Sequence, residues 1–321
     1  MNKWFLLFTA VFLTSSSCEL FKPAPVDDSI LVIDYQPFGE KYSRGKTKVK
    51  KLPELSTLRL EKNLPVLDGA TALYPLYAAF VRAIYPEDDY YPYGTNQLVC
   101  VSGTSRAYNN LIDGKVDLIF CAKPSAEQIE KAKEKGITFQ MTPIGREAFV
   151  FFVNNKNSVS GLNVEQIIGI YSGKIENWSE LKGKNEEIKV YQRPKNSGSQ
   201  TMLESIMGSN KIKPPLQEDV VNFMGGMITQ TAGYRNYQNA IGYSFLFFST
   251  QMVKNSQIKL LSINGVYPSA ETIRADTYPY AEEFYAITAK NKNENVNKII
   301  DWILSEQGQY LVNQTGYVSI R

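Results

Sequence analysis

The chain has 321 residues, 43% of them hydrophobic and 21% charged, so it is long enough to bury two cores of ordinary domain size. A net charge of +3 is too small to indicate a nucleic-acid-binding surface, although it leaves small anions as attractive partners. The sequence contains no histidine, which excludes Ser-His-Asp and Cys-His catalysis and removes the commonest zinc ligand. An enzyme is therefore disfavoured, and we expect no metal or cofactor.

The first residues are typical of a secretory signal peptide, with a charged start, an apolar run over 4–13 and small residues over 14–17. The apolar run is too short to span a bilayer. The small residues that end in Cys18 resemble a bacterial lipoprotein cleavage site, although Ser15 stands where such sites usually carry leucine. We therefore expect a signal peptide over 1–17 and a lipid on Cys18 that holds the protein on a periplasm-facing or cell-surface membrane. An ordinary signal peptide that contains a cysteine is the alternative.

Residues 18–57 are rich in Lys, Pro and Asp and contain one brief apolar run, at 30–33, so we expect a tether and an N-terminal extension. From residue 58 short β-rich runs lead through Gly, Ser and Thr loops into amphipathic helices. This alternation is typical of an α/β lobe with a mainly parallel sheet. The predicted elements are strands at 65–67, 98–101 and 116–121, and helices at 72–85, after 105 to about 113, and at 126–135.

A second cycle of elements begins with a fully buried strand. Its elements are a strand at 147–154, a helix at 164–172, a strand at 188–192 and a helix at 200–207, before a late strand at 284–288 and a helix at 296–313. If this tail returns to the first lobe, two strands cross between the lobes and form a hinge. The predicted division is 58–148 plus 281–321 for lobe I and 149–280 for lobe II. Cys100 and Cys121 could pair in an oxidising compartment, but we expect free thiols because they end two strands that should flank a third.

Three loops rich in glycine and hydroxyl groups, at 69–71, 102–105 and 197–199, each precede a predicted helix. Free backbone N–H groups and the positive end of the helix dipole hold anions at such places. Arg193 lies four residues before the last loop, and its guanidinium could hold two oxygens of a tetrahedral anion. Any single loop is more simply a helix cap, and a lone arginine is more often a surface residue. Their repetition in both lobes favours a site for a small oxyanion.

Residues 160–178 are similar to the signature region of phosphate-binding proteins that feed ABC transporters. Further stretches match that family in the same order at 68–71, 193–199, 240–243 and 305–318, so the resemblance runs from about residue 65 to 321. It implies the type II periplasmic-binding fold, in which two α/β lobes close on the ligand. It also implies a non-catalytic receptor that delivers inorganic phosphate to a membrane permease. We expect a monomer without a nucleic-acid partner.

The resemblance also implies the ligand-binding residues. They are Thr71, Ala72 (through its backbone), Thr104, Ser105, Arg193, Ser197, Gly198 and Ser199. The sequence departs from the family at Ala122, where well-known members carry an aspartate that accepts the proton of monohydrogen phosphate and repels sulfate. This change leaves the choice of oxyanion open, with Asp68 or a backbone carbonyl as other acceptors. The alternatives are a receptor for sulfate or molybdate, and a sensory or surface lipoprotein that keeps the fold.

Overall fold

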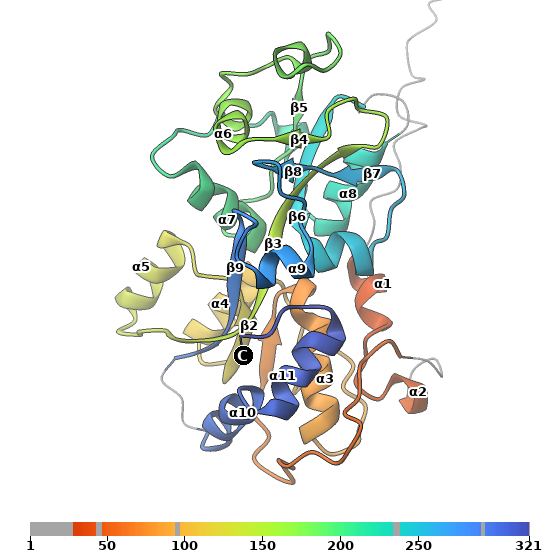
Figure 1. The fold of residues 1–321 in the computed structure, drawn as a ribbon. Coiled ribbons are helices and arrows are strands. Elements are labelled where there is room, and N and C mark those ends of the chain that lie inside the picture. The colour runs from red at the N-terminus through yellow and green to blue at the C-terminus, as the bar shows by residue number, and fades with distance from the viewer. Residues whose placement is uncertain (1–27, 43–46, 94–96, 234–237, 290–292, 321) are drawn as a thin grey trace, which may run out of the picture.

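The computed structural model of the chain describes residues 28–42, 47–93, 97–233, 238–289 and 293–320. These residues form an α/β protein with two lobes, one above the other in Figure 1, which a central sheet joins. The predicted signal peptide and Cys18 lie outside the described residues. We call lobe I the part built on β1, β2 and β9 and lobe II the part built on β5, β6 and β7.

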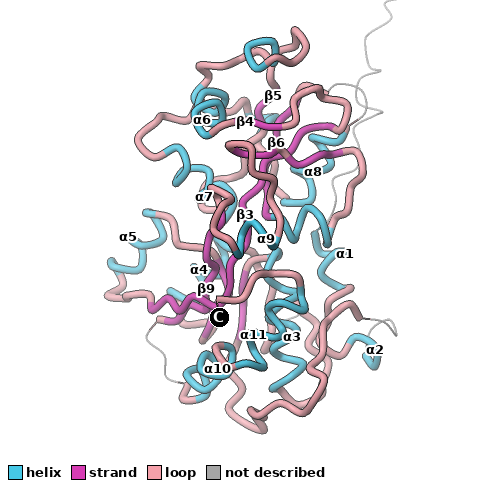
Figure 2. Tube along the Cα trace, viewed as in Figure 1, coloured by secondary structure: helices cyan, strands magenta, loops and turns pink. Residues whose placement is uncertain are grey.

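The central sheet follows the strand order β1-β2-β9-β3-β6-β5, and β7 also pairs with β3. Its strands are β1 (Leu67–Gly69), β2 (Leu118–Cys121), β3 (Gln140–Asn154), β5 (Lys189–Val190), β6 (Ala240–Phe245), β7 (Ile258–Leu260) and β9 (Ala281–Thr288). Outside it, β4 (Gly161–Leu162) pairs with β8 (Ser262–Ile263). Figure 2 shows the strands running along the middle of the molecule.

Strand β3 belongs to both lobes. Its residues 140–148 pair with β9, and its residues 149–154 pair with β6 or β7. The run 147–154 is buried at every position, as expected for a strand that is covered on both faces. Two long neighbouring strands, β3 and β9, therefore lie where the lobes meet, in agreement with the predicted fold.

The expectation of a mainly parallel sheet is wrong. Strands β1 and β2 are parallel, as are β5 and β6, but β3 is antiparallel to β6, β7 and β9, and β2 is antiparallel to β9. Hydrophobic periodicity reports which residues are buried, and it carries no information on the direction of the neighbouring strand. The predicted strand at 98–101 is reduced to one bridge, between Val99 and Leu67.

Most helices begin and end near the predicted positions. Helix α6 (Val164–Ser172) has the predicted bounds, because Asn163 and Gln166 form a capping box and Gly173, with a φ of 75°, ends the helix. The predicted helix 296–313 is instead two helices, because the Ser305 hydroxyl accepts a hydrogen bond from the Gly308 N–H and starts a new one. The other helices are α3 (Tyr74–Ile84), α4 (Thr104–Ile112), α5 (Ala126–Glu134), α7 (Gly198–Met207), α8 (Met224–Ala232), α9 (Ala270–Arg274), α10 (Asn295–Ile303) and α11 (Glu306–Thr315). Short 3-10 or π turns are η1 (Thr71–Leu73), η2 (Trp178–Leu181), η3 (Gln217–Asp219) and η4 (Phe248–Met252).

The N-terminal extension packs against the lobes over its described residues, where the composition predicted a tether. It contains α1 (Asp28–Ile33) and α2 (Gly39–Tyr42). Val32, Tyr35 and Val49 are buried in the hydrophobic core. Arg82 of α3 also donates a hydrogen bond to the Glu40 carboxylate at 3.0 Å. Only a few apolar residues make these core contacts. The composition of the segment, which is rich in Lys and Pro, therefore did not predict that it packs against the lobes.

Cys100 and Cys121 are free thiols, as predicted. Burial raises the pKa of the Cys100 thiol to about 11, and it also raises the pKa of Cys121, which is fully buried in β2. Both side chains are therefore protonated at neutral pH and pack as small apolar groups.

Candidate anion-binding cleft

A cleft of about 740 Å³ lies between the two lobes, lined by the starts of helices from both of them. Lobe I contributes η1 and the start of α4, and lobe II contributes the starts of α7 and α8. Seven of the eight residues predicted to bind ligand line this cleft: Thr71, Thr104, Ser105, Arg193, Ser197, Gly198 and Ser199. Segments more than a hundred residues apart in the sequence thus meet at one place.

Lobe I brings hydroxyl groups to the cleft on two short turns. Thr71 is the first residue of η1, and Thr104 and Ser105 are the first residues of α4. Gly103, which precedes α4, has a φ of 79°, a backbone conformation that glycine adopts without strain. The first N–H groups of a helix have no partner within the helix, so both turns present N–H donors beside hydroxyl groups.

Lobe II presents the start of α7. The Ser197 hydroxyl caps this helix by accepting a hydrogen bond from the Gln200 N–H at 3.3 Å. The Ser199 side chain is 1% exposed, and its hydroxyl has no hydrogen-bond partner among the described residues. Leaving such a group unsatisfied costs about 1–3 kcal/mol, so this hydroxyl is suited to a ligand oxygen.

Arg193 lies between β5 and α7 and is held at two points. Its Nη1 donates to the Val221 carbonyl at 2.8 Å, and its backbone N–H donates to the Tyr243 hydroxyl at 2.8 Å. The Nε is buried and has no partner in the part of the chain that the structure describes. Burial lowers the pKa of the guanidinium, and the Asp28 carboxylate opposes that shift. Arg193 therefore offers a fixed positive charge with an unused donor.

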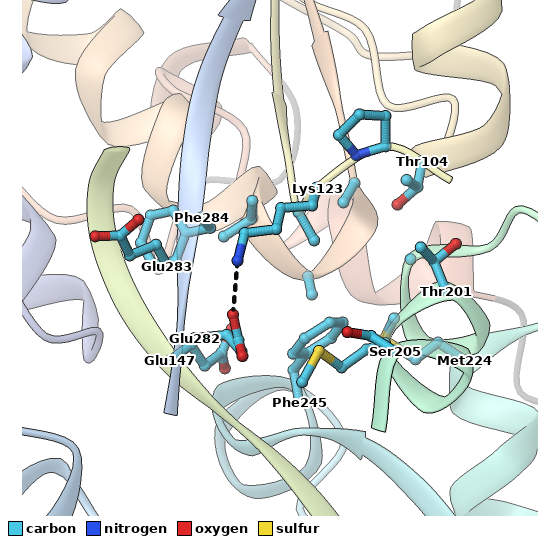
Figure 3. A pocket seen from close by; sticks show the side chains of 17 residues that line it. Thr104, Lys123, Glu147, Thr201, Ser205, Met224, Phe245, Glu282, Glu283 and Phe284 are labelled. Atoms are coloured by element: carbon cyan, nitrogen blue, oxygen red, sulfur yellow. Dashed lines mark hydrogen bonds and ion pairs between the residues drawn. The ribbon is translucent and has the colours of Figure 1, made fainter. Parts of the chain in front are cut away.

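A smaller cavity of about 190 Å³ adjoins the cleft and shares Ala70, Thr104, Gly198 and Met224 with it. Figure 3 shows this cavity, with Thr104 and Thr201 at one side and Glu147, Glu282 and Glu283 at the other. The Lys123 ammonium lies 3.2 Å from a Glu282 carboxylate oxygen. Lys123 is thereby paired with a carboxylate and does not line the larger cleft.

Two positions singled out in the sequence line this smaller cavity and not the cleft. They are Ala72 and Ala122. The Ala72 carbonyl accepts a hydrogen bond from the Tyr317 hydroxyl. The backbone group of Ala72 that could bind a ligand at the start of η1 is therefore its N–H. The Ala122 carbonyl accepts one from the Tyr108 hydroxyl at 2.6 Å. The Ala122 side chain supplies no acceptor to a bound anion.

Asp68, the other acceptor considered from the sequence, is used inside lobe I. It is fully buried and does not line the cleft. Its Oδ1 accepts hydrogen bonds from the N–H groups of Gly69 and Ser102, at 2.7 and 2.9 Å. Its Oδ2 accepts from the Ser102 hydroxyl and, at 2.9 Å, from the Asn110 amide. Four donors satisfy this carboxylate, which therefore orders the loop at 102–105.

Three features of the cleft were missed in the sequence. Arg106 follows Ser105 in the first turn of α4, and a basic residue directly after an anion-type loop was an available signal. The start of α8 gave no signal, because the residue that precedes it, Phe223, has no side-chain group that could cap the helix. Asp28 of the extension also lines the cleft, and nothing near it in the sequence connects it to the other residues.

The lobes are in contact around the cleft. The Ser125 hydroxyl donates to the Asn196 side-chain oxygen at 2.8 Å, and Lys195 pairs with Glu127 at 2.6 Å. A Cβ atom added to Gly198 of lobe II would lie 2.9 Å from the Thr104 hydroxyl oxygen of lobe I. The two lobes therefore touch each other directly beside the cleft.

Comparison with known proteins identifies the family. The model of the PBP superfamily domain matches residues 65–307, which is more than half of the chain. The chain belongs to the PBP superfamily. This PBP superfamily member is 26% identical over 257 residues to phosphate-binding protein PstS of Bacillus subtilis, which covers 79% of this chain and 80% of that protein. It is 24% identical over 228 residues to phosphate-binding protein PstS of Borreliella burgdorferi, with 68% and 78% covered.

Solved structures of related fold agree with this assignment. The PBP superfamily member resembles a candidate phosphate ABC transporter substrate-binding protein with bound phosphate from Clostridium perfringens, with a TM-score of 0.63 and 22% identity over 79% of this chain and 98% of that one. It also resembles an ABC-type phosphate transport receptor from Vibrio cholerae, with a TM-score of 0.58 and 21% identity over 78% and 98%. The predicted two-lobed α/β fold is confirmed.

Proposed function

We propose that this PBP superfamily member captures inorganic phosphate in the cleft between its lobes and delivers it to an ABC transporter. The observation that carries the proposal is that two residues lining one cleft, Arg193 and Ser199, each have a buried donor without a partner among the described residues, the Arg193 Nε and the Ser199 hydroxyl. A tetrahedral oxyanion would satisfy both donors and would also accept from the helix starts. The relatives that are named phosphate-binding proteins support phosphate as the ligand.

In this proposal the ligand is bound from both lobes. The binding residues are Thr71, Ala72, Thr104 and Ser105 from lobe I, and Arg193, Ser197, Gly198 and Ser199 from lobe II. The Ser197 hydroxyl accepts from the helix that it caps and keeps its own proton to donate to the ligand. Ala72 takes part only through its backbone N–H. These residues offer almost only hydrogen-bond donors, which suits a multiply charged anion because its oxygens accept hydrogen bonds.

Arg193→Ala tests the site. Loss of a buried, charge-assisted interaction should weaken phosphate binding by about 2 to 4 kcal/mol, which is roughly 30- to 900-fold. Isothermal titration calorimetry with phosphate measures this loss, and Arg59→Ala, at an exposed position outside the cleft, is the matched control. Unchanged affinity in Arg193→Ala would remove Arg193 from the site, and a wild-type protein that gives no phosphate isotherm would overturn the proposed function.

A receptor for sulfate or molybdate is the competing function, and Ala122 favours it because this side chain offers no acceptor to a protonated anion. The same calorimetric titration, repeated with each of these anions, separates the two functions. Tighter binding of sulfate or molybdate than of phosphate would replace phosphate as the ligand in our proposal.

We further propose that a lipid on Cys18 anchors the protein outside the cytoplasm, where it acts as a monomer beside its permease. Within the described residues no helix is long and apolar enough to cross a membrane. The Vibrio cholerae neighbour, described as a transport receptor, supports a role in uptake. A pull-down with the mature chain from a membrane extract of its own cells would test the partnership, and recovery of no ABC-transporter permease would contradict it.

A further inference from the structure

The smaller cavity is a separate space next to the proposed phosphate site. Its volume is about 190 Å³, and both lobes line it, with Leu73 and Ala122 from lobe I and Phe245 from lobe II among the residues that do so. An apolar cavity of about 150 Å³ is large enough to hold benzene. The cavity beside the cleft therefore has room for a small organic group.

Apolar side chains dominate the lining of this cavity (Figure 3). An organic group that enters it exchanges contact with water for contact with apolar atoms, which is favourable. The apolar part of the lining includes Leu73, Ala122, Pro124, Met202, Phe245 and Phe284.

The charged groups in the lining are neutralised or reach solvent. Glu282 pairs with Lys123 at 3.2 Å. Burial raises the pKa of Glu147 to about 8, so most of this carboxyl group is uncharged at neutral pH. Glu283 is exposed and accepts a hydrogen bond from the Tyr285 hydroxyl at 2.8 Å. The described lining thus offers no buried, unpaired charge to an ammonium or a carboxylate, and it suits an uncharged group.

The cavity and the cleft share a border. Ala70, Thr104, Gly198 and Met224 line both spaces. Because Thr104 and Gly198 are among the proposed phosphate ligands, a phosphoryl group bound to them would lie next to the cavity. Alanine and glycine carry little or no side chain, and the methionine side chain is unbranched and adaptable. These residues form the border that a substituent on the phosphorus atom would cross.

An unused hydroxyl group in the lining also points to a ligand. Thr201 lies one turn after Gly198 in α7, and Figure 3 shows it on the same side of the cavity as Thr104. Its hydroxyl oxygen is buried and has no hydrogen-bond partner among the described residues. Since an unsatisfied buried hydroxyl costs free energy, this group is suited to an oxygen of a bound molecule.

We propose that the cleft and the cavity together bind a phosphoryl compound with one small, uncharged organic substituent, a phosphonate or a phosphate monoester, in addition to inorganic phosphate. The phosphoryl group occupies the phosphate site at Arg193 and Ser199, and the substituent occupies the cavity. The inference rests on the proposed function, because it requires a phosphoryl group bound in the cleft. A phosphonate places carbon directly in the cavity, whereas the ester oxygen of a monoester can also accept a hydrogen bond from Thr201.

Titration calorimetry of the purified protein with methyl-, ethyl- and propylphosphonate, beside inorganic phosphate, tests this inference. Each further CH₂ group buried in the cavity should raise the affinity roughly fourfold, so propylphosphonate should bind about 15-fold more tightly than methylphosphonate. Ethyl phosphate has an ester oxygen where propylphosphonate has its first CH₂ group. Tighter binding of ethyl phosphate than of propylphosphonate indicates a monoester as the ligand, and the reverse order indicates a phosphonate.

Ala122→Leu fills the cavity from a residue that does not line the cleft. This variant should bind inorganic phosphate as the wild type does, but it should lose the gain in affinity from methyl- to propylphosphonate. Ala126→Leu is the matched control, because Ala126 is an exposed residue of α5 outside both spaces, and it should keep the gain. Circular dichroism checks that both variants are folded, and the wild-type series tests the inference without either of them.

An affinity that does not rise with the length of the alkyl chain overturns the inference, as does binding of inorganic phosphate without binding of any substituted compound. An equal gain in Ala122→Leu and in the wild type also overturns it, because the substituent would then lie outside the cavity. A wild-type protein that binds neither inorganic phosphate nor any substituted compound overturns the proposed function instead, so the two failures are distinct.

Discussion

Gly198→Ala tests whether binding depends on the close contact between the lobes. The new Cβ atom would lie 2.9 Å from the Thr104 hydroxyl oxygen, whereas ordinary contacts begin at about 3.4 Å. Overpacking of this kind costs about 1 to 3 kcal/mol. Because the two residues belong to different lobes, the molecule can relieve the clash by keeping the lobes apart, so the cost falls on the arrangement in which the lobes touch at this point. Phosphate affinity, measured by calorimetry, should fall roughly 5- to 150-fold.

The stability of the ligand-free protein should not fall with the affinity. Gly198 begins α7 without a positive φ, so alanine fits its backbone and should add up to about 1 kcal/mol of helix stability. Thermal unfolding without ligand measures this effect. Adding Thr104→Ala removes the short contact, so the double variant should bind better than the sum of the two single losses predicts. Wild-type affinity in Gly198→Ala, or a loss of affinity matched by a loss of stability, would refute this reasoning.

Two further predictions concern the anchor and the region between the lobes. Cys18→Ser should release soluble protein and abolish labelling by a fatty-acid analogue, and equal labelling of both proteins would exclude the lipid anchor. Burial raises the pKa of Glu147 to about 8, partly offset by a hydrogen bond from the Phe247 N–H, while the ordinary value is 4.5. The folded state therefore holds a proton that the unfolded state has lost between about pH 4.5 and 8, so stability should fall as the pH rises through that window. Glu147→Gln keeps an acceptor for the Phe247 N–H but cannot titrate, so the free energy of unfolding, measured with urea at each pH, should depend less on pH in this variant. An equal pH dependence in the two proteins would contradict this prediction.

The features that the sequence predicts well are local ones. The capping box of Asn163 and Gln166 and the terminating Gly173 define α6 through bonds within one helix. The hydroxyl loops before η1, α4 and α7 were also recognised, because a helix start and its neighbouring side chains are close in sequence. The family resemblance then grouped these loops into one proposed site, and the structure brings them to one cleft.

The features that the sequence could not predict depend on long-range contacts. The direction of β9 beside β3, the donors of Ser102 and Asn110 that bind Asp68 and the charge interaction of Asp28 with Arg193 all join segments that are distant along the chain. Thus the sequence by itself determined the class of fold, the anion-type loops and the arginine beside them. The signals used for these predictions, namely strand–loop–helix units, helix starts and their neighbouring side chains, are each local in the sequence. Only the tertiary structure decided that Asp28 lines the cleft and Asp68 does not, because hydrogen bonding and charge interaction depend on distance in space and not on separation along the chain.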